Sequence, residues 1–151
     1  MKILSMVLFV VFGFAVVSCD QGPNAPWGFS LPEGNAEQGK LVFKHYQCLS
    51  CHTLEGMELG DIENNPDISV KLGGKSTKVK TYAELVTSII NPSHRLAVGY
   101  PKDMIQLDKH SKMPVYNDVM TVTELIDLVS FLQTQYVLVP YRRTPYYEYL
   151  R

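Results

Sequence analysis

The sequence predicts a small all-α domain of three to five helices joined by unusually long loops. Three segments carry the apolar period of a helix that buries one face. No stretch alternates in the two-residue period of a strand, and glycine and proline are common between the helical segments. With 151 residues, of which 46% are hydrophobic, the chain can bury the core of one domain.

The first helix is expected over residues 36–46. Asn35 precedes it as an N-cap, and Gln38 stands three positions further on, as in a capping box. Gly39 and Phe43 lie four positions apart, so they share one face of the helix.

Capping-box pairs also mark the starts of the second and third helices. These pairs are Thr81 with Glu84 and Thr121 with Glu124, and Pro92 ends the second helix. Both helices therefore have defined starts and one apolar face. The apolar positions are Tyr82, Leu85, Val86 and Ile89 in the second helix, and Leu125, Leu128, Val129, Leu132 and Tyr136 in the third.

The charge balance gives no sign of a nucleic-acid partner. The chain has 14 Lys and Arg against 15 Asp and Glu, for a formal net charge of −1. Nucleic-acid-binding domains instead carry a clear excess of basic residues. We therefore expect no nucleic acid among its partners.

Residues 1–18 are typical of an export signal. Lys2 gives a basic start, and residues 3–17 form an apolar run that is short for a membrane span and suits the core of a secretory signal. The run ends in Val-Val-Ser-Cys, which resembles the lipobox of bacterial lipoproteins, where the chain is cut before the cysteine and Cys19 would be lipidated. The alternative is an uncleaved anchor helix with an incidental cysteine.

Both alternatives predict a domain outside the cytoplasm and attached to a membrane, on the periplasmic side. Residues 19–34, rich in Pro, Gly and Asn, would form a lipidated tether. Asp20 resembles an inner-membrane retention signal of some bacteria. The folded domain is expected over residues 35–137, followed by a Tyr/Arg-rich tail over 138–151.

The run Cys48-Leu-Ser-Cys51-His52 is a C-x-x-C-H motif, the attachment signature of c-type haem. Two thiols at this spacing can add to the two vinyl groups of a porphyrin, and the next residue offers an imidazole to the iron. The two cysteines have three alternative roles: a disulfide, a thioredoxin-like site or a zinc site. Thioredoxin chemistry does not need the histidine, and zinc would need further ligands at recognisable spacing. The motif therefore predicts one covalent haem c, with His52 as an iron ligand.

A second axial ligand would close the iron to other molecules. Met113 is the best placed candidate, since it stands in a loop, is followed by Pro114 and precedes Thr121 by eight residues. Its alternative role is that of an ordinary loop or core methionine. The sequence offers six candidates for this second ligand: Met57, His94, Met104, His110, Met113 and Met120.

Over residues 35–136 the chain resembles the class I monohaem cytochromes c. Gly39 and Phe43 match positions of that family's N-terminal helix, while Leu128 and Phe131 match its C-terminal helix. The resemblance implies that these two helices cross closely and that the fold wraps around one haem.

The resemblance also implies two further site residues. Pro66 matches the family proline whose carbonyl accepts a hydrogen bond from the ligand imidazole. The stretch from Met113 to Tyr116 matches the loop that carries the distal ligand. The chain departs from the family pattern in its lysines after the glycine pair, and in a longer stretch over residues 90–100.

Together these observations predict a one-electron carrier and not an enzyme. The expected partners are a redox protein that donates the electron and another that accepts it, with no small-molecule substrate. One alternative is a haem subunit fixed in a larger oxidoreductase. Another is a gas sensor or peroxidase in which Met113 does not close the iron. The Tyr/Arg-rich tail is a further hypothesis for partner docking.

Overall fold

The computed structural model describes residues 31–58, 60 and 67–140. The described residues from Glu33 onward belong to one compact unit. The predictions for Cys19, Pro66 and most of the tail fall outside these residues. Four helices are present in the described part: α2 (Ala36–His45), α3 (Tyr82–Ile90), α4 (Lys102–Ile105) and α5 (Val122–Thr134).

The predicted small, mostly helical fold is confirmed. Helices α2, α3 and α5 begin where the sequence placed them and end within one or two residues of the expected position. Among the described residues, no helix is both long and apolar enough to cross a membrane.

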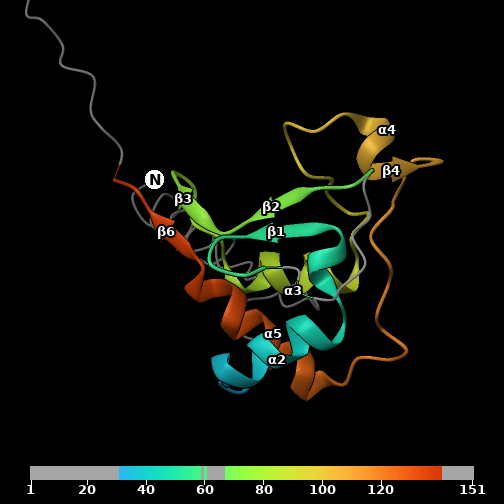
Figure 1. Cartoon of the computed structure of the whole chain (residues 1–151). Helices are drawn as coiled ribbons and strands as arrows, with labels where there is room; N and C mark the ends of the chain where they lie inside the picture. The colour runs from blue at the N-terminus through green and yellow to red at the C-terminus, as the bar shows by residue number, and fades with distance from the viewer. Residues whose placement is uncertain (1–30, 59, 61–66, 141–151) are drawn as a thin grey trace, which may run out of the picture. The chain divides into compact units, whose positions relative to one another are not determined.

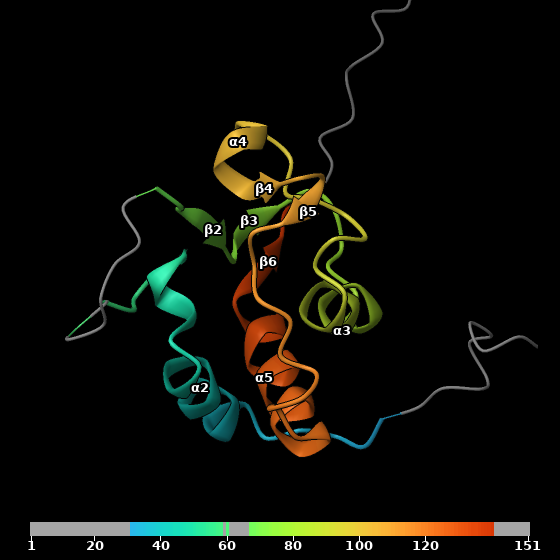
Figure 2. The ribbon, with the colours of Figure 1, turned by 90° about the vertical axis from the view of Figure 1, so that its right-hand side faces the viewer.

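Helices α2 and α5 cross in direct contact (Figures 1 and 2). A Cβ atom on Gly39 would overlap the backbone carbonyl of Asp127, so only glycine lets the two backbones approach this closely. Beside this point the rings of Phe43 and Phe131 pack with centroids 5.7 Å apart. The close crossing that the resemblance implied is therefore present.

The caps of α3 and α5 form as predicted, whereas the cap of α2 differs. Asn35 Oδ1 accepts hydrogen bonds from the backbone N–H groups of Glu37 and Gln38, at 2.9 and 3.1 Å. The backbone N–H of Asn35, however, donates to Asp127 Oδ1 of α5 at 2.7 Å. The return bond expected from the Gln38 side chain is thus supplied by a residue 92 positions away in the sequence.

The described residues also form three two-stranded sheets that the sequence did not predict. Strand β1 (His52–Leu54) pairs in parallel with β2 (Val70–Leu72), and β3 (Gly74–Ser76) pairs in parallel with β6 (Tyr136–Leu138). Strand β4 (Gln106–Leu107) pairs antiparallel with β5 (His110–Ser111). Strands of two or three residues are too short to show an alternating pattern.

The glycine pair joins two of these sheets. Gly73 and Gly74 have φ angles of +71° and +82°, a region that glycine enters at little cost. The chain can therefore turn sharply from β2 into β3. As a result β2 lies beside β1, which begins at His52 of the motif, and β3 lies beside β6, which follows α5.

The buried side chains come mainly from α2, α3 and α5. Six of them line a cavity: Phe43, Leu85, Ile89, Ile105, Leu128 and Leu132. The buried hydrophobic residues are Phe43, Leu49, Leu54, Leu85, Val86, Ile89, Ile105, Ile126, Leu128, Val129, Phe131 and Leu132.

Candidate functional site

A cavity of about 750 Å³ occupies the space between α3, α5 and the C-x-x-C-H motif. This volume falls within the range of roughly 300–1,000 Å³ that is usual for small-molecule and cofactor sites. Buried side chains of three helices line it, including Phe43, Leu85 and Leu128. The cavity therefore adjoins the apolar core of the domain.

Cys48 and Cys51 both line this cavity. A single 3₁₀ turn, Cys48–Ser50, carries the first thiol, and the backbone N–H of Cys51 donates to the Cys48 carbonyl at 3.3 Å. The two thiols are free and not joined in a disulfide. One short turn thus presents both sulfur atoms to the same space.

The electrostatics at Cys48 disfavour thiolate chemistry. Burial raises the pKa of this thiol to about 11, and the neighbouring Cys51 adds to the shift. A reactive cysteine needs the opposite shift, because the thiolate is the nucleophile. The thioredoxin-like alternative therefore finds no support at this thiol.

His52 follows directly and also lines the cavity. Its Nδ1 lies 3.1 Å from the carbonyl oxygen of Val70, which is paired with it across β1 and β2. Since a carbonyl can only accept, Nδ1 carries the proton and Nε2 keeps a free lone pair. Burial lowers the pKa of His52, although the bond to Val70 works in the other direction. The imidazole is therefore neutral at pH 7 and suited to bind a metal.

The contact between His52 Nδ1 and the Val70 carbonyl is of the kind that the resemblance implied for Pro66. Pro66 lies outside the described residues, so the prediction for its carbonyl stays a prediction. The bond from His52 to the Val70 carbonyl was not foreseen, because a backbone acceptor leaves no signature in the amino-acid sequence. Only the pairing of β1 with β2 reveals it.

Three of the six candidate ligands for the second axial position line the cavity: His94, Met113 and Met120. Met113 is half-buried and its backbone N–H is hydrogen-bonded, whereas His94 is exposed. His94 Nδ1 lies 3.0 Å from the Asn91 carbonyl within its own turn. The structure thus brings the predicted pair, His52 and Met113, to one cavity.

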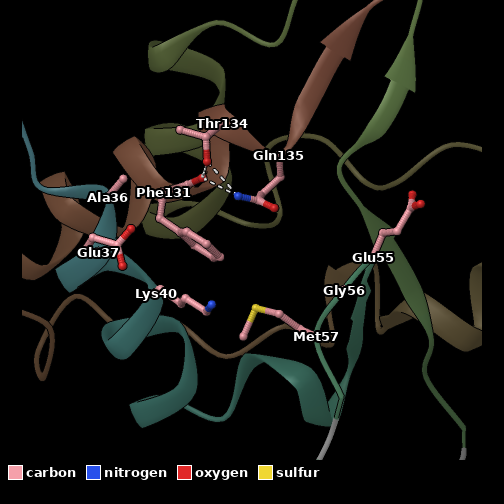
Figure 3. A pocket seen from close by; sticks show the side chains of 9 residues that line it. All are labelled: Ala36, Glu37, Lys40, Glu55, Gly56, Met57, Phe131, Thr134 and Gln135. Atoms are coloured by element: carbon pink, nitrogen blue, oxygen red, sulfur yellow. Dashed lines mark hydrogen bonds between the residues drawn. The ribbon is translucent and has the colours of Figure 1, made fainter.

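The other three candidates are not among the residues that line this cavity. Met57 lines a separate hollow of about 300 Å³ between α2, the turn after β1 and the end of α5. Its side chain points toward Phe131 and Lys40 there (Figure 3). Met104 lies on the short helix α4, and His110 is exposed on β5.

The rim of the cavity is basic, although the chain as a whole is weakly acidic. Glu84 is the one acidic residue among the described residues that line it, and it forms an ion pair with Arg95 at 2.6 Å. Nearby, Tyr100 contributes its hydroxyl oxygen as acceptor for the backbone N–H of Lys71, at 2.9 Å. The basic residues along the lining are Lys71, Lys75, Lys78, Lys80, Arg95 and Lys112.

Within residues 31–58, 60 and 67–140, no three or more His, Cys, Asp or Glu side chains gather into a group that could hold a metal ion. The donor set at the cavity instead suits a haem. It offers two thiols for the vinyl groups, one neutral imidazole, apolar walls for the porphyrin and a basic rim for its carboxylates.

Fold and site thus define a haem-binding protein of the c type. The family model for cytochrome c matches residues 36–135, about two thirds of the chain, and the chain belongs to this family. Cytochromes c hold a covalent haem c and transfer electrons. Searches of the curated proteins and of the solved structures gave no match.

Proposed function

We propose that this protein is a one-electron carrier with a single haem c, linked to Cys48 and Cys51 and ligated by His52 and Met113. The observation that carries the proposal is the shared cavity. It places the thiols and imidazole of the motif together with Met113, a residue 61 positions further along the chain than His52.

Each of these residues has a distinct task. The haem, when bound, supplies the one-electron redox chemistry. The Val70 carbonyl fixes the ring of His52 and makes Nε2 the ligating atom. His52 and Met113 would together hold the iron, and with both bound the metal would have no free position for a substrate. Methionine ligation would also raise the reduction potential.

We further propose that the protein acts on the periplasmic side of a bacterial membrane, held by a lipid on Cys19. The proposal is supported by the apolar run of residues 3–17, by the lipobox-like Val-Val-Ser-Cys and by the family, whose haem is attached after export. The partners would then be membrane-linked or periplasmic redox proteins.

The ligand proposal is tested by the absorption spectrum of the oxidised, haem-loaded protein. Wild type should show the weak sulfur-to-iron charge-transfer band, and Met113→Ala should lose it. Met57→Ala serves as the matched control, because Met57 lies in the other hollow and its loss should leave the band intact. A wild type without the band, whose reduced form binds carbon monoxide readily, would overturn the proposal in favour of a sensor or an enzyme.

The anchor is tested by growing cells with a labelled fatty acid. The label should appear in wild type and not in Cys19→Ser. Label in both proteins, or in neither, would contradict lipidation at this residue. Purification from membranes under mild detergent then separates a free carrier, which comes away alone, from a subunit that retains the same partners in constant ratio.

A further inference from the structure

The stretch of residues 91–100, longer than in small members of the family, lies along the cavity and is bonded to three separate parts of the domain. Arg95 Nη1 donates to Glu84 Oε1 of α3 at 2.6 Å. The Tyr100 hydroxyl accepts from the backbone N–H of Lys71 in β2 at 2.9 Å. The third contact is made by Ser93 with β5. These bonds tie the segment at the start, middle and end of its length.

The contact of Ser93 continues toward the predicted axial methionine. Ser93 Oγ accepts a hydrogen bond from the backbone N–H of Ser111 at 3.0 Å. Ser111 Oγ in turn accepts from the backbone N–H of Met113 at 3.1 Å. Two serine hydroxyls thus connect the 91–100 segment to the peptide group of Met113.

The hairpin explains why the Ser111 N–H is available. Ser111 pairs with Gln106 across β4 and β5, and the next residue, Lys112, donates its backbone N–H to the Ile105 carbonyl at 2.9 Å. Successive N–H groups of a strand point to opposite sides. The N–H of Ser111 therefore points away from its partner strand β4, and it donates instead to Ser93 Oγ.

Met113 is consequently restrained on both sides of its Cα atom. Its own N–H is held by Ser111, and the next residue, Pro114, has a fixed φ angle and restricts the backbone of the residue before it. This matters because a methionine side chain has three flexible bonds and its sulfur is a weak ligand. A backbone fixed in advance reduces the ordering cost of bringing that sulfur to a metal.

We propose that Ser93 and Ser111 are positioning residues that hold Met113 at the cavity and so make the closed iron resistant to external ligands. The inference rests on the proposed function, in which Met113 is the second axial ligand. It also gives a role to the 91–100 segment, which anchors Ser93 through the bonds of Arg95 and Tyr100.

The test is a titration of the oxidised, haem-loaded full-length protein with imidazole, followed by loss of the sulfur-to-iron band. Ser111→Ala should bind imidazole roughly 3- to 10-fold more tightly, as expected for the loss of one net hydrogen bond. Ser93→Ala should bind about 2-fold more tightly, because Ser93 is exposed and water can replace its hydroxyl.

Two further variants separate positioning from general destabilisation. Ser111→Thr keeps the hydroxyl and should restore the wild-type affinity. Thr87→Val removes a hydroxyl that bonds only the Ala83 carbonyl within α3 and does not line the cavity, so it should leave the affinity unchanged. The exposed Ser93 offers a variant that folds even if Ser111→Ala does not.

The outcomes are distinct. If wild type lacks the sulfur-to-iron band, the proposed function fails and this inference falls with it. If wild type has the band but the two alanine variants bind imidazole like Thr87→Val, the inference alone is wrong. Tighter binding in both alanine variants, with recovery in Ser111→Thr, supports it.

Discussion

The crossing of α2 and α5 and the distal region, residues 91–121, are built in opposite ways. At the crossing, two helix backbones touch at Gly39 and the side chains are almost fully buried, with Phe43 only 1% exposed. The distal region lines the cavity and contains α4 and the β4–β5 hairpin, and after β5 its chain runs down along α5 (Figure 2). Its valines are exposed: Val98 is 92% and Val119 66% accessible.

The difference lies in what holds each region. Apolar burial and close packing fix the crossing, so its geometry admits little change. The distal region adds Ile105 to the core but is otherwise held by hydrogen bonds and the Glu84–Arg95 ion pair, each of which contributes little to stability. Substitutions at the crossing should therefore alter folding, whereas those in the distal region should alter how Met113 is presented.

The largest effect is expected for Gly39→Val. Any side chain at this position meets the Asp127 carbonyl and the Cβ atom of Phe131, so the helices must move apart. The loss should be at least about 3 kcal/mol in the free energy of unfolding, at the upper end of overpacking effects. Denaturant unfolding measures it, with the exposed Lys40→Ala of the same helix as control. Equal stability of the two variants would show that the crossing can relax.

A smaller effect tests whether α5, which forms the crossing, and α3, which leads into the distal region, unfold together. Thr121→Ala and Thr81→Ala each remove the hydroxyl that accepts the Glu124 or Glu84 backbone N–H, in both cases at 3.2 Å. Each should lower stability by about 1 kcal/mol, the usual effect of a lost N-cap. If Thr81→Ala left global unfolding unchanged while α3 amides exchanged faster, α3 would open as a separate unit.

The smallest effect is expected at the ion pair of the distal region. Burial raises the pKa of the Glu84 carboxyl, but bonds from Thr81 and Arg95 and the charges of Lys80 and Arg95 outweigh it, so the net pKa lies below 4.5. Because this pKa is lowered on folding, the stabilisation is present above pH 4.5 and is lost as pH falls through the folded value.

Arg95→Gln should therefore cost no more than about 0.5 kcal/mol at neutral pH, since the Arg95 side chain is 65% exposed and the pair is screened by solvent. The difference from wild type should shrink in acid, below pH 4.5. Denaturant unfolding across this pH range checks the sign. A difference that grows as the pH falls would contradict it.

Local sequence patterns predicted much of the helical fold. The Thr81 and Thr121 capping boxes form as expected, and Gly39 and Phe43 are buried. These features depend on residues within four positions of one another, so they are visible in the chain itself. The three short sheets are not, because their pairing joins segments such as 52–54 and 70–72 that carry no period of their own.

The candidate site likewise has features that the sequence showed and features that only the structure showed. The C-x-x-C-H motif and the Met-Pro pair indicated the chemistry, because the attachment of haem needs particular side chains at a fixed spacing. The acceptor for His52 and the second partner of Asn35 came only from the structure: the Val70 carbonyl and the Asp127 carboxylate. The hydrogen bonds from Ser111 N–H to Ser93 Oγ and from Met113 N–H to Ser111 Oγ likewise became visible only in the structure.

By itself, the sequence indicated the covalent haem chemistry and the approximate boundaries of α2, α3 and α5, which are written in short runs of residues. The tertiary structure decided which residues share the cavity and which backbone groups hold them. His52 and Met113 lie 61 positions apart, and no local pattern can specify a distance between them. It depends on how α2 and α3 pack against α5 and on the hydrogen bonds of residues 91–121, because both join segments that are far apart in the sequence.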